Sequence, residues 1–186
     1  MDALQLSGGD TLLVVGASGG VGSFAVQLAA SQGITVMGPA LPEDEEYLRN
    51  LGVGELLDRG AEVGGRVADA VLDLVSYAPG AFDAALKEGG RVASPNSAAG
   101  EGPGRTDVFA IPSPENLERL ARLLEDGTLR VPIQETYELE RAGEALEALG
   151  TTHTQGNRPS GSLSGERPRG RRCRAGPLRG HWRPSC

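Results

Sequence analysis

Residues 12–22 read LLVVGASGGVG, an apolar run that ends in a cluster of four glycines. The run at 11–15 is short, aliphatic and β-branched, which predicts a buried strand. Apolar residues from Val21 to Ala29 recur at helical spacing and predict an amphipathic helix. A second strand is predicted at residues 34–37. A strand, a helix and a second strand in this order form a βαβ unit and favour an α/β fold.

The glycine loop at residues 16–22 fits more than one phosphate-binding pattern. A Walker loop ends in Gly-Lys-Ser/Thr, and the absence of a lysine here excludes it. Gly16, Gly19 and Gly22 follow the dinucleotide-binding fingerprint, with one extra residue in the first interval. Gly16, Gly20 and Gly22 instead suit the short-chain reductases. In both patterns the unpaired N–H groups at the helix N-terminus would receive a phosphate.

The tyrosines of the chain decide between these two patterns. Short-chain reductases resemble one another in carrying a catalytic tyrosine with a lysine four residues later. Tyr47, Tyr77 and Tyr137 are followed at that spacing by leucine, alanine and arginine, and the single lysine of the chain is Lys87. The short-chain pattern is therefore excluded, and the dinucleotide fingerprint is the better interpretation of the loop.

The alternation of strands and helices continues along the chain. Helices are predicted at 43–50, 81–87, 114–124 and 140–149, and strands at 55–57, 70–75, 90–94 and 131–137. Pro132 cannot donate to a strand ladder, which places the last strand at a sheet edge. The fold class is therefore α/β, a Rossmann-type doubly wound parallel sheet of about six strands. We expect this domain to span residues 1–156.

The charge of the chain is divided unevenly along its length. Residues 1–150 carry 10 basic and 24 acidic side chains, whereas residues 151–186 carry eight arginines and one glutamate. An acidic body argues against a nucleic-acid partner. No apolar stretch approaches the roughly 20 residues that cross a bilayer. Because the N-terminus also lacks the features of a signal peptide, we expect a cytoplasmic protein without a membrane partner.

Residues 157–186 form a tail rich in arginine, glycine, proline and serine. Such a segment buries too little apolar surface to offset its ordering entropy, so we expect it to be disordered. Cys173, His181 and Cys186 match no zinc-binding spacing. An arginine-rich tail that binds nucleic acid is one interpretation, and a non-native terminus is the one we favour.

With these features assembled, the body resembles the cofactor-binding domain of the medium-chain dehydrogenases/reductases. Within that superfamily it is most similar to the quinone oxidoreductase branch, which includes NADP-dependent and zinc-binding oxidoreductases. The matching text is GDTLLVVGASGGVGSFAVQLAASQG, then AVLDLVS, then LKEGGRVAS, then LEDGTLRVPIQETYELERAGEALEALGTTHTQG. Because several segments match in order, the resemblance is more specific than a lone glycine motif.

The resemblance implies a Rossmann domain that binds a dinucleotide across the C-terminal ends of its strands. The pyrophosphate would be cradled by Gly16, Ser18, Gly19, Gly20, Val21 and Gly22. The adenosine ribose would lie near Pro39 and Ala40, just past the second strand. The nicotinamide ribose would lie near Leu74 and Val75, which end the fourth strand, and near Ser94 and Pro95 after the fifth.

The resemblance also implies a hydride transfer to a small-molecule substrate, a quinone, enone or carbonyl. In the family an N-terminal domain holds most of the substrate pocket and any zinc, and here Met1 falls just before the first Rossmann strand. We therefore expect this chain to lack that domain, and we assign no catalytic residue and no metal. His153 and His181 lie at or beyond the end of the domain. A dinucleotide-binding fragment without turnover is the alternative.

The residues after the second strand leave the choice of cofactor open. An acidic residue there would favour NAD(H) and a basic one NADP(H), but residues 38–40 offer neither. The acidic run at 43–46 would repel a phosphate that lay close. Zinc-free relatives commonly use NADPH, so we predict NADP(H), with NAD(H) as the alternative. The resemblance further implies a homodimer through the edge strand at 131–137.

Overall fold

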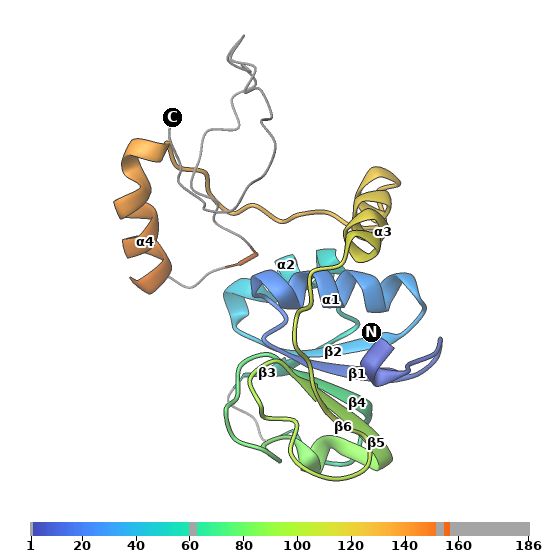
Figure 1. Ribbon diagram of the computed structural model, residues 1–186. Coiled ribbons are helices and arrows are strands. Elements are labelled where there is room, and N and C mark those ends of the chain that lie inside the picture. Colours follow the sequence, from blue (N-terminus) through green and yellow to red (C-terminus); the bar gives the residue numbers. More distant parts are fainter. Residues whose placement is uncertain (1, 60–62, 152–154, 157–186) are drawn as a thin grey trace, which may run out of the picture.

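A six-stranded parallel sheet forms the centre of the computed structural model, which describes residues 2–59, 63–151 and 155–156 (Figure 1). Its strands are β1 (Thr11–Val15), β2 (Thr35–Ala40), β3 (Glu55–Asp58), β4 (Ala68–Asp73), β5 (Leu86–Ser94) and β6 (Arg105–Asp107). They lie in the order β3-β2-β1-β4-β5-β6, and each neighbouring pair is parallel. This is the strand order of the dinucleotide-binding Rossmann fold, so the predicted fold class is confirmed.

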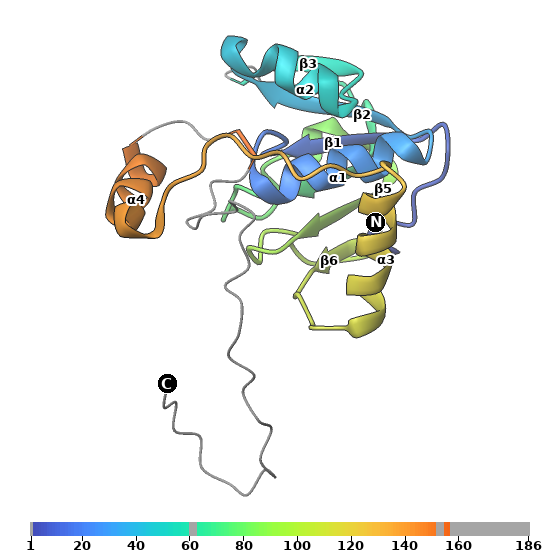
Figure 2. The same cartoon turned by 90° about the horizontal axis from the view of Figure 1, so that it is seen from above.

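The helices are α1 (Gly20–Ser31), α2 (Glu45–Leu51), α3 (Pro114–Glu125) and α4 (Ala142–Thr151), with short 3₁₀ turns η1 (Asp2–Leu4), η2 (Pro42–Asp44), η3 (Asp83–Ala85) and η4 (Leu139–Arg141). Seen from above, α1 lies along the sheet between α2 and α3 (Figure 2). In both views α4 lies apart from the sheet. Gly52, at a φ of 109°, ends α2 in the left-handed conformation that glycine adopts without strain.

Each face of the sheet carries its own apolar core. Because successive strand residues point to opposite faces, Leu12 and Val14 pack with Val26 of α1 on one side. Leu13 and Val15 pack on the other side. That second side is covered by η3 and its flanking loops rather than by a long helix. Fully burying side chains of this size contributes about 1.5–3 kcal/mol each, which fixes β1 at the centre of the molecule.

Two elements expected from the sequence are wrong. Instead of a helix at 81–87 there is the 3₁₀ turn η3, and β5 already begins at Leu86. Leu86 and Ala85 are both buried against the sheet, so packing of this segment overrides its weak helical pattern. The strand expected at 131–137 contains only single bridge residues, at Ile133 and Tyr137. The sheet ends instead at β6, so Pro132 does not mark a sheet edge.

Candidate dinucleotide site

The crevice between the carboxyl ends of β1 and β4 is the topological switch point of the sheet. The strand order runs outward from β1 to β3 on one side and from β4 to β6 on the other. Open α/β sheets bind ligands in the crevice beyond their carboxyl ends at this point. The glycine loop follows β1, and the segment beginning at Leu74 follows β4. Leu74 is held against the first strand because its N–H donates to the Val15 carbonyl at 3.1 Å.

Gly16 and Gly22 shape the loop by allowing close approach. Gly16 has a φ of +88°, and a Cβ there would lie 2.7 Å from Cγ2 of Val75. A Cβ on Gly22 would lie 2.1 Å from the Gly16 carbonyl oxygen and 2.8 Å from Cα of Ala17. Both distances are too short for a real side chain. These two glycines therefore let α1 start directly behind β1.

The start of α1 offers backbone donors without helical acceptors. Gly19 is the N-cap, in an extended conformation, and the first bond of the helix is from Ser23 N–H to its carbonyl at 2.9 Å. The N–H groups of Gly20, Val21 and Gly22 consequently have no acceptor within the helix. No side chain caps them, and no acidic residue lies in the first turn. The helix dipole adds positive potential here, so the loop is suited to an anion.

Two adjoining cavities open at this crevice. The larger, about 460 Å³, is lined by nine of the residues predicted to bind the cofactor and by Arg59 and Asn96. Those nine are Gly16, Ser18, Gly19, Gly20, Val21, Gly22, Leu74, Val75 and Pro95. The smaller, about 180 Å³, includes Pro39, Asp44 and Arg59 in its lining. The structure thus brings ten of the twelve predicted residues together at the cavities.

Ala40 and Ser94 line neither cavity. Ala40 is the last residue of β2 rather than a residue past it, and it belongs to the core. Ser94 is fully buried at the end of β5, where its Oγ accepts from the Asn96 N–H at 3.1 Å. Ser94 therefore positions a lining residue, Asn96, from beneath.

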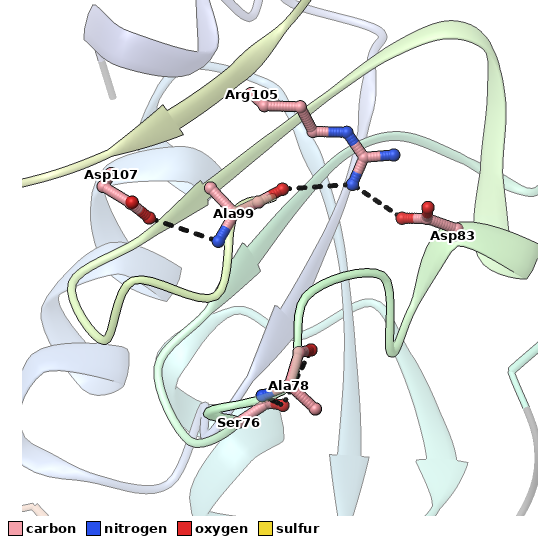
Figure 3. Close-up of polar contacts among 6 residues, drawn as sticks. All are labelled: Ser76, Ala78, Asp83, Ala99, Arg105 and Asp107. Atoms are coloured by element: carbon pink, nitrogen blue, oxygen red, sulfur yellow. Dashed lines mark hydrogen bonds and ion pairs between the residues drawn. The ribbon is translucent and has the colours of Figure 1, made fainter. Parts of the chain in front are cut away.

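The loop after β4 is held by a buried carboxylate. Asp73 is only 2% exposed, and its Oδ1 accepts from the N–H groups of Val75 at 3.1 Å and Ser76 at 2.9 Å. Ser76 Oγ in turn accepts from the Ala78 N–H at 2.9 Å (Figure 3). These bonds fix the position of Val75, whose exposed side chain lines both cavities.

The loop after β5 is tied to β6 and η3. Arg105 Nη1 donates to Asp83 Oδ1 at 2.6 Å and to the Ala99 carbonyl at 3.2 Å, and the Ala99 N–H donates to Asp107 Oδ1 at 3.2 Å (Figure 3). The short strand β6 therefore holds the loop that begins with Pro95. This gives the far wall of the larger cavity a fixed support.

Residues 155–156, the last described ones, lie against the glycine loop. The Gly156 N–H donates to the Ser18 carbonyl at 2.8 Å, and Gly156 forms a parallel bridge with Gly19. Gln155 Nε2 donates to Oδ1 of Asp44 at 2.7 Å and to the Glu43 carbonyl at 3.0 Å. The 155–156 segment thus joins the loop after β1 to the start of α2.

Asp44, Arg59 and Tyr47 are the titratable groups of interest around the smaller cavity. Asp44 is 2% exposed, and Arg59 directly follows β3 with an exposed side chain. Burial raises the pKa of Tyr47, the Asp44 carboxylate raises it further, and the Ser23 hydroxyl opposes both. Tyr47 therefore stays un-ionised at neutral pH.

Sequence reasoning missed Arg59 and Asn96 and considered Asp44 only as part of an acidic run. The available signal was position: Arg59 lies just past a predicted strand, and parallel strands end at the same edge. In the described part of the chain, no three histidine, cysteine or acidic side chains cluster as metal ligands. No helix among the described residues is long and apolar enough to cross a membrane. Cys173, Cys186, His153, His181 and the tail from 157 lie outside the described residues.

With this fold and site in view, comparison with known proteins identifies the family. The zinc-binding dehydrogenase family model matches residues 51–157. The chain therefore belongs to the zinc-binding dehydrogenase family, within the medium-chain dehydrogenases/reductases, and the resemblance seen in the sequence is confirmed.

Individual relatives agree with this assignment. A chloroplast envelope quinone oxidoreductase homolog from Arabidopsis thaliana is 29% identical over 158 aligned positions, which cover 72% of this chain and 47% of the relative. The solved quinone oxidoreductase from Coxiella burnetii is 27% identical with a TM-score of 0.74, covering 87% of this chain and 55% of that one. A solved NAD-dependent alcohol dehydrogenase is 25% identical with a TM-score of 0.70, covering 87% and 53%. This chain thus spans about half the length of these relatives.

Proposed function

We propose that this chain binds NADP(H) as the cofactor-binding part of an oxidoreductase of the quinone oxidoreductase type. The observation that carries the proposal is the larger cavity at the β1–β4 switch point, with unpaired N–H groups on one wall and apolar side chains on another. A bound nicotinamide supplies the hydride that reduces a quinone, enone or carbonyl. The similarity to two quinone oxidoreductase relatives supports this substrate class.

The residues of the chain have distinct roles in this proposal. The N–H groups of Gly20, Val21 and Gly22 donate to the pyrophosphate, where the helix dipole favours negative charge. Pro39 lines the adenosine end in the smaller cavity. Val75 lies at the junction of the two cavities and provides apolar surface. This wall excludes water from the reacting end of the larger cavity.

Binding without turnover is the second candidate. Among the residues that line the two cavities, the side chains that titrate are Asp44 and Arg59, and none is a histidine, cysteine, lysine or tyrosine. Reduction of a carbonyl requires a proton donor within hydrogen-bond reach of the oxygen. The described lining offers no such donor at the larger cavity, which favours a dinucleotide-binding role for the chain by itself.

Titration with NADPH and NADH, followed by nicotinamide fluorescence, tests the proposal. Val21→Asp is the informative variant, because it places a carboxylate among the N–H groups that should hold the pyrophosphate. Acidic residues in a first helical turn are stabilising, so the variant should remain folded while its dinucleotide affinity falls at least about tenfold. Val131→Asp, at an exposed valine outside both cavities, is the matched control and should bind normally.

Two outcomes would contradict parts of the proposal. No fluorescence change with either dinucleotide would reject both candidates. Unchanged affinity in Val21→Asp would reject the loop as the pyrophosphate site. Binding followed by NADPH consumption with a quinone supports the enzyme, whereas binding without consumption by any quinone, enone or carbonyl supports the second candidate.

We also propose a homodimer and a cytoplasmic location, each as an independent point. The homodimer was expected through residues 131–137, which are not a sheet strand. The free edge of the sheet is β6 (Arg105–Asp107), whose partner in the described sheet is β5 on its inner side. Light scattering of the purified chain tests the dimer, and cell fractionation tests the location.

A further inference from the structure

Arg59 lines both cavities of the candidate site, and it is the one basic side chain in either lining. It immediately follows β3, and its N–H donates to the carbonyl of Ala40 at 3.3 Å. Although it comes 19 residues after Ala40 in the sequence, Arg59 therefore lies at the carboxyl end of β2. This is the place at which Rossmann folds recognise the adenosine ribose.

The surrounding charge makes an arginine at this place informative. Residues 43–46 are all acidic, and Asp44 lines the smaller cavity together with Arg59. Asp44 already accepts from Gln155 Nε2 at 2.7 Å. Its carboxylate is thus engaged by the 155–156 segment, while Arg59 supplies the positive charge that this acidic surface otherwise lacks.

The chemistry of the guanidinium selects the ligand group. NADP(H) differs from NAD(H) by one phosphate on the 2′ position of the adenosine ribose. Arginine presents a planar set of N–H donors that matches phosphate oxygens and remains charged at all relevant pH values. We propose that Arg59 binds the 2′-phosphate and makes the chain selective for NADP(H). This inference rests on the proposed function, since it assumes that the crevice holds a dinucleotide.

Paired titrations of NADPH and NADH at one fixed salt concentration test the inference. Arg59→Gln should weaken NADPH binding by about 10- to 100-fold, as expected for loss of a charge-assisted bond to phosphate, and should change NADH binding less than about threefold. Arg59→Lys keeps the charge and should recover most of the NADPH affinity. Arg49→Gln removes one exposed charge from α2, outside both cavities, and should alter neither.

The outcomes separate this inference from the proposed function. An equal loss for NADPH and NADH in Arg59→Gln would overturn it, because Arg59 would then act on the shared pyrophosphate. Unchanged NADPH affinity, or a wild-type chain that prefers NADH, would also overturn it. Failure of the proposed function itself is recognised earlier, as a wild-type chain that binds neither dinucleotide. Circular dichroism of each variant confirms that the compared chains are folded.

Discussion

Replacing Gly22 by alanine should separate the start of α1 from the end of β1. An alanine Cβ at this position would lie 2.1 Å from the Gly16 carbonyl oxygen and 2.8 Å from Cα of Ala17. Carbon and oxygen atoms in unstrained contact are about 3.3–3.6 Å apart. The helix or the loop must therefore move by at least about 1.2 Å. Both obstacles are backbone atoms, so no side-chain rotation relieves the contact.

The expected loss of stability follows from two opposing effects. Overpacking of a rigid site costs about 1–3 kcal/mol and occasionally more. Alanine regains about 0.5–1 kcal/mol relative to glycine within a helix. Because a displacement above 1 Å belongs at the upper end of the first range, we expect the Gly22→Ala chain to lose about 1–2 kcal/mol. The displaced N–H groups should also weaken dinucleotide binding.

Urea unfolding followed by circular dichroism measures this change. With m-values near 1–3 kcal/mol/M, the midpoint should fall by roughly 0.5–2 M. Gly143→Ala in α4 is the matched control, since a Cβ there meets no atom within 4 Å, and its midpoint should not fall. A Gly22→Ala chain as stable as the wild type would refute the close-approach argument.

Two further predictions concern α1 and the sheet edge. Gln27→Leu removes the amide that donates to the Arg130 carbonyl at 3.0 Å and accepts from its N–H at 2.8 Å; we expect a loss of about 1–3 kcal/mol, and a loss below 0.5 kcal/mol would contradict it. The Lys87 ammonium holds the pKa of Asp69 below its usual value, mainly through their 2.8 Å hydrogen bond. The bonded carboxylate therefore stabilises the fold above the unfolded pKa of 3.8, and this contribution is lost as the pH falls through the lower folded pKa. The free-energy difference between wild type and Asp69→Asn, below about 1 kcal/mol for such an exposed pair, should be constant from pH 7 to 5 and shrink below pH 4; a difference that persists at pH 2 would contradict the assignment.

The first half of the sheet was predictable because its signals are local. Residues 11–15 form a short apolar run, and α1 has the periodicity expected up to Ser31. Such patterns report burial of a strand or a helix face directly. The same locality made the glycine loop recognisable, since strand, loop and helix follow one another without interruption.

The far edge of the sheet was not predictable from local pattern. β6 has three residues, two of them exposed, and follows a glycine-rich loop. Its strand conformation depends on pairing with Val92–Ser94 and on the bond from Arg105 to Asp83. Neither partner is visible in the strand itself. The alternation at 131–137 was misleading for the converse reason, because no sheet edge lies beside it.

The same distinction applies to the candidate site. Residues on the glycine loop were found because their spacing is a motif. Arg59 reaches the site only because β3 pairs with β2, and Asp44 is buried together with Gln155, which is 111 residues later. Ala40 was assigned to the site because the strand was expected to end at residue 37, whereas β2 continues to Ala40. An error of three residues in a strand boundary was enough to exchange a core residue for a lining one.

The contact between the glycine loop and the 155–156 segment has a consequence for synthesis of the chain. At elongation rates of about 5–20 residues per second, Gln155 is added roughly 5–20 s after Asp44. Since β1, α1 and β2 all precede residue 41, they are translated well before the segment that contacts the loop. A nascent chain thus exposes its glycine loop on the ribosome without this cover for a period much longer than the microseconds in which helices and hairpins form.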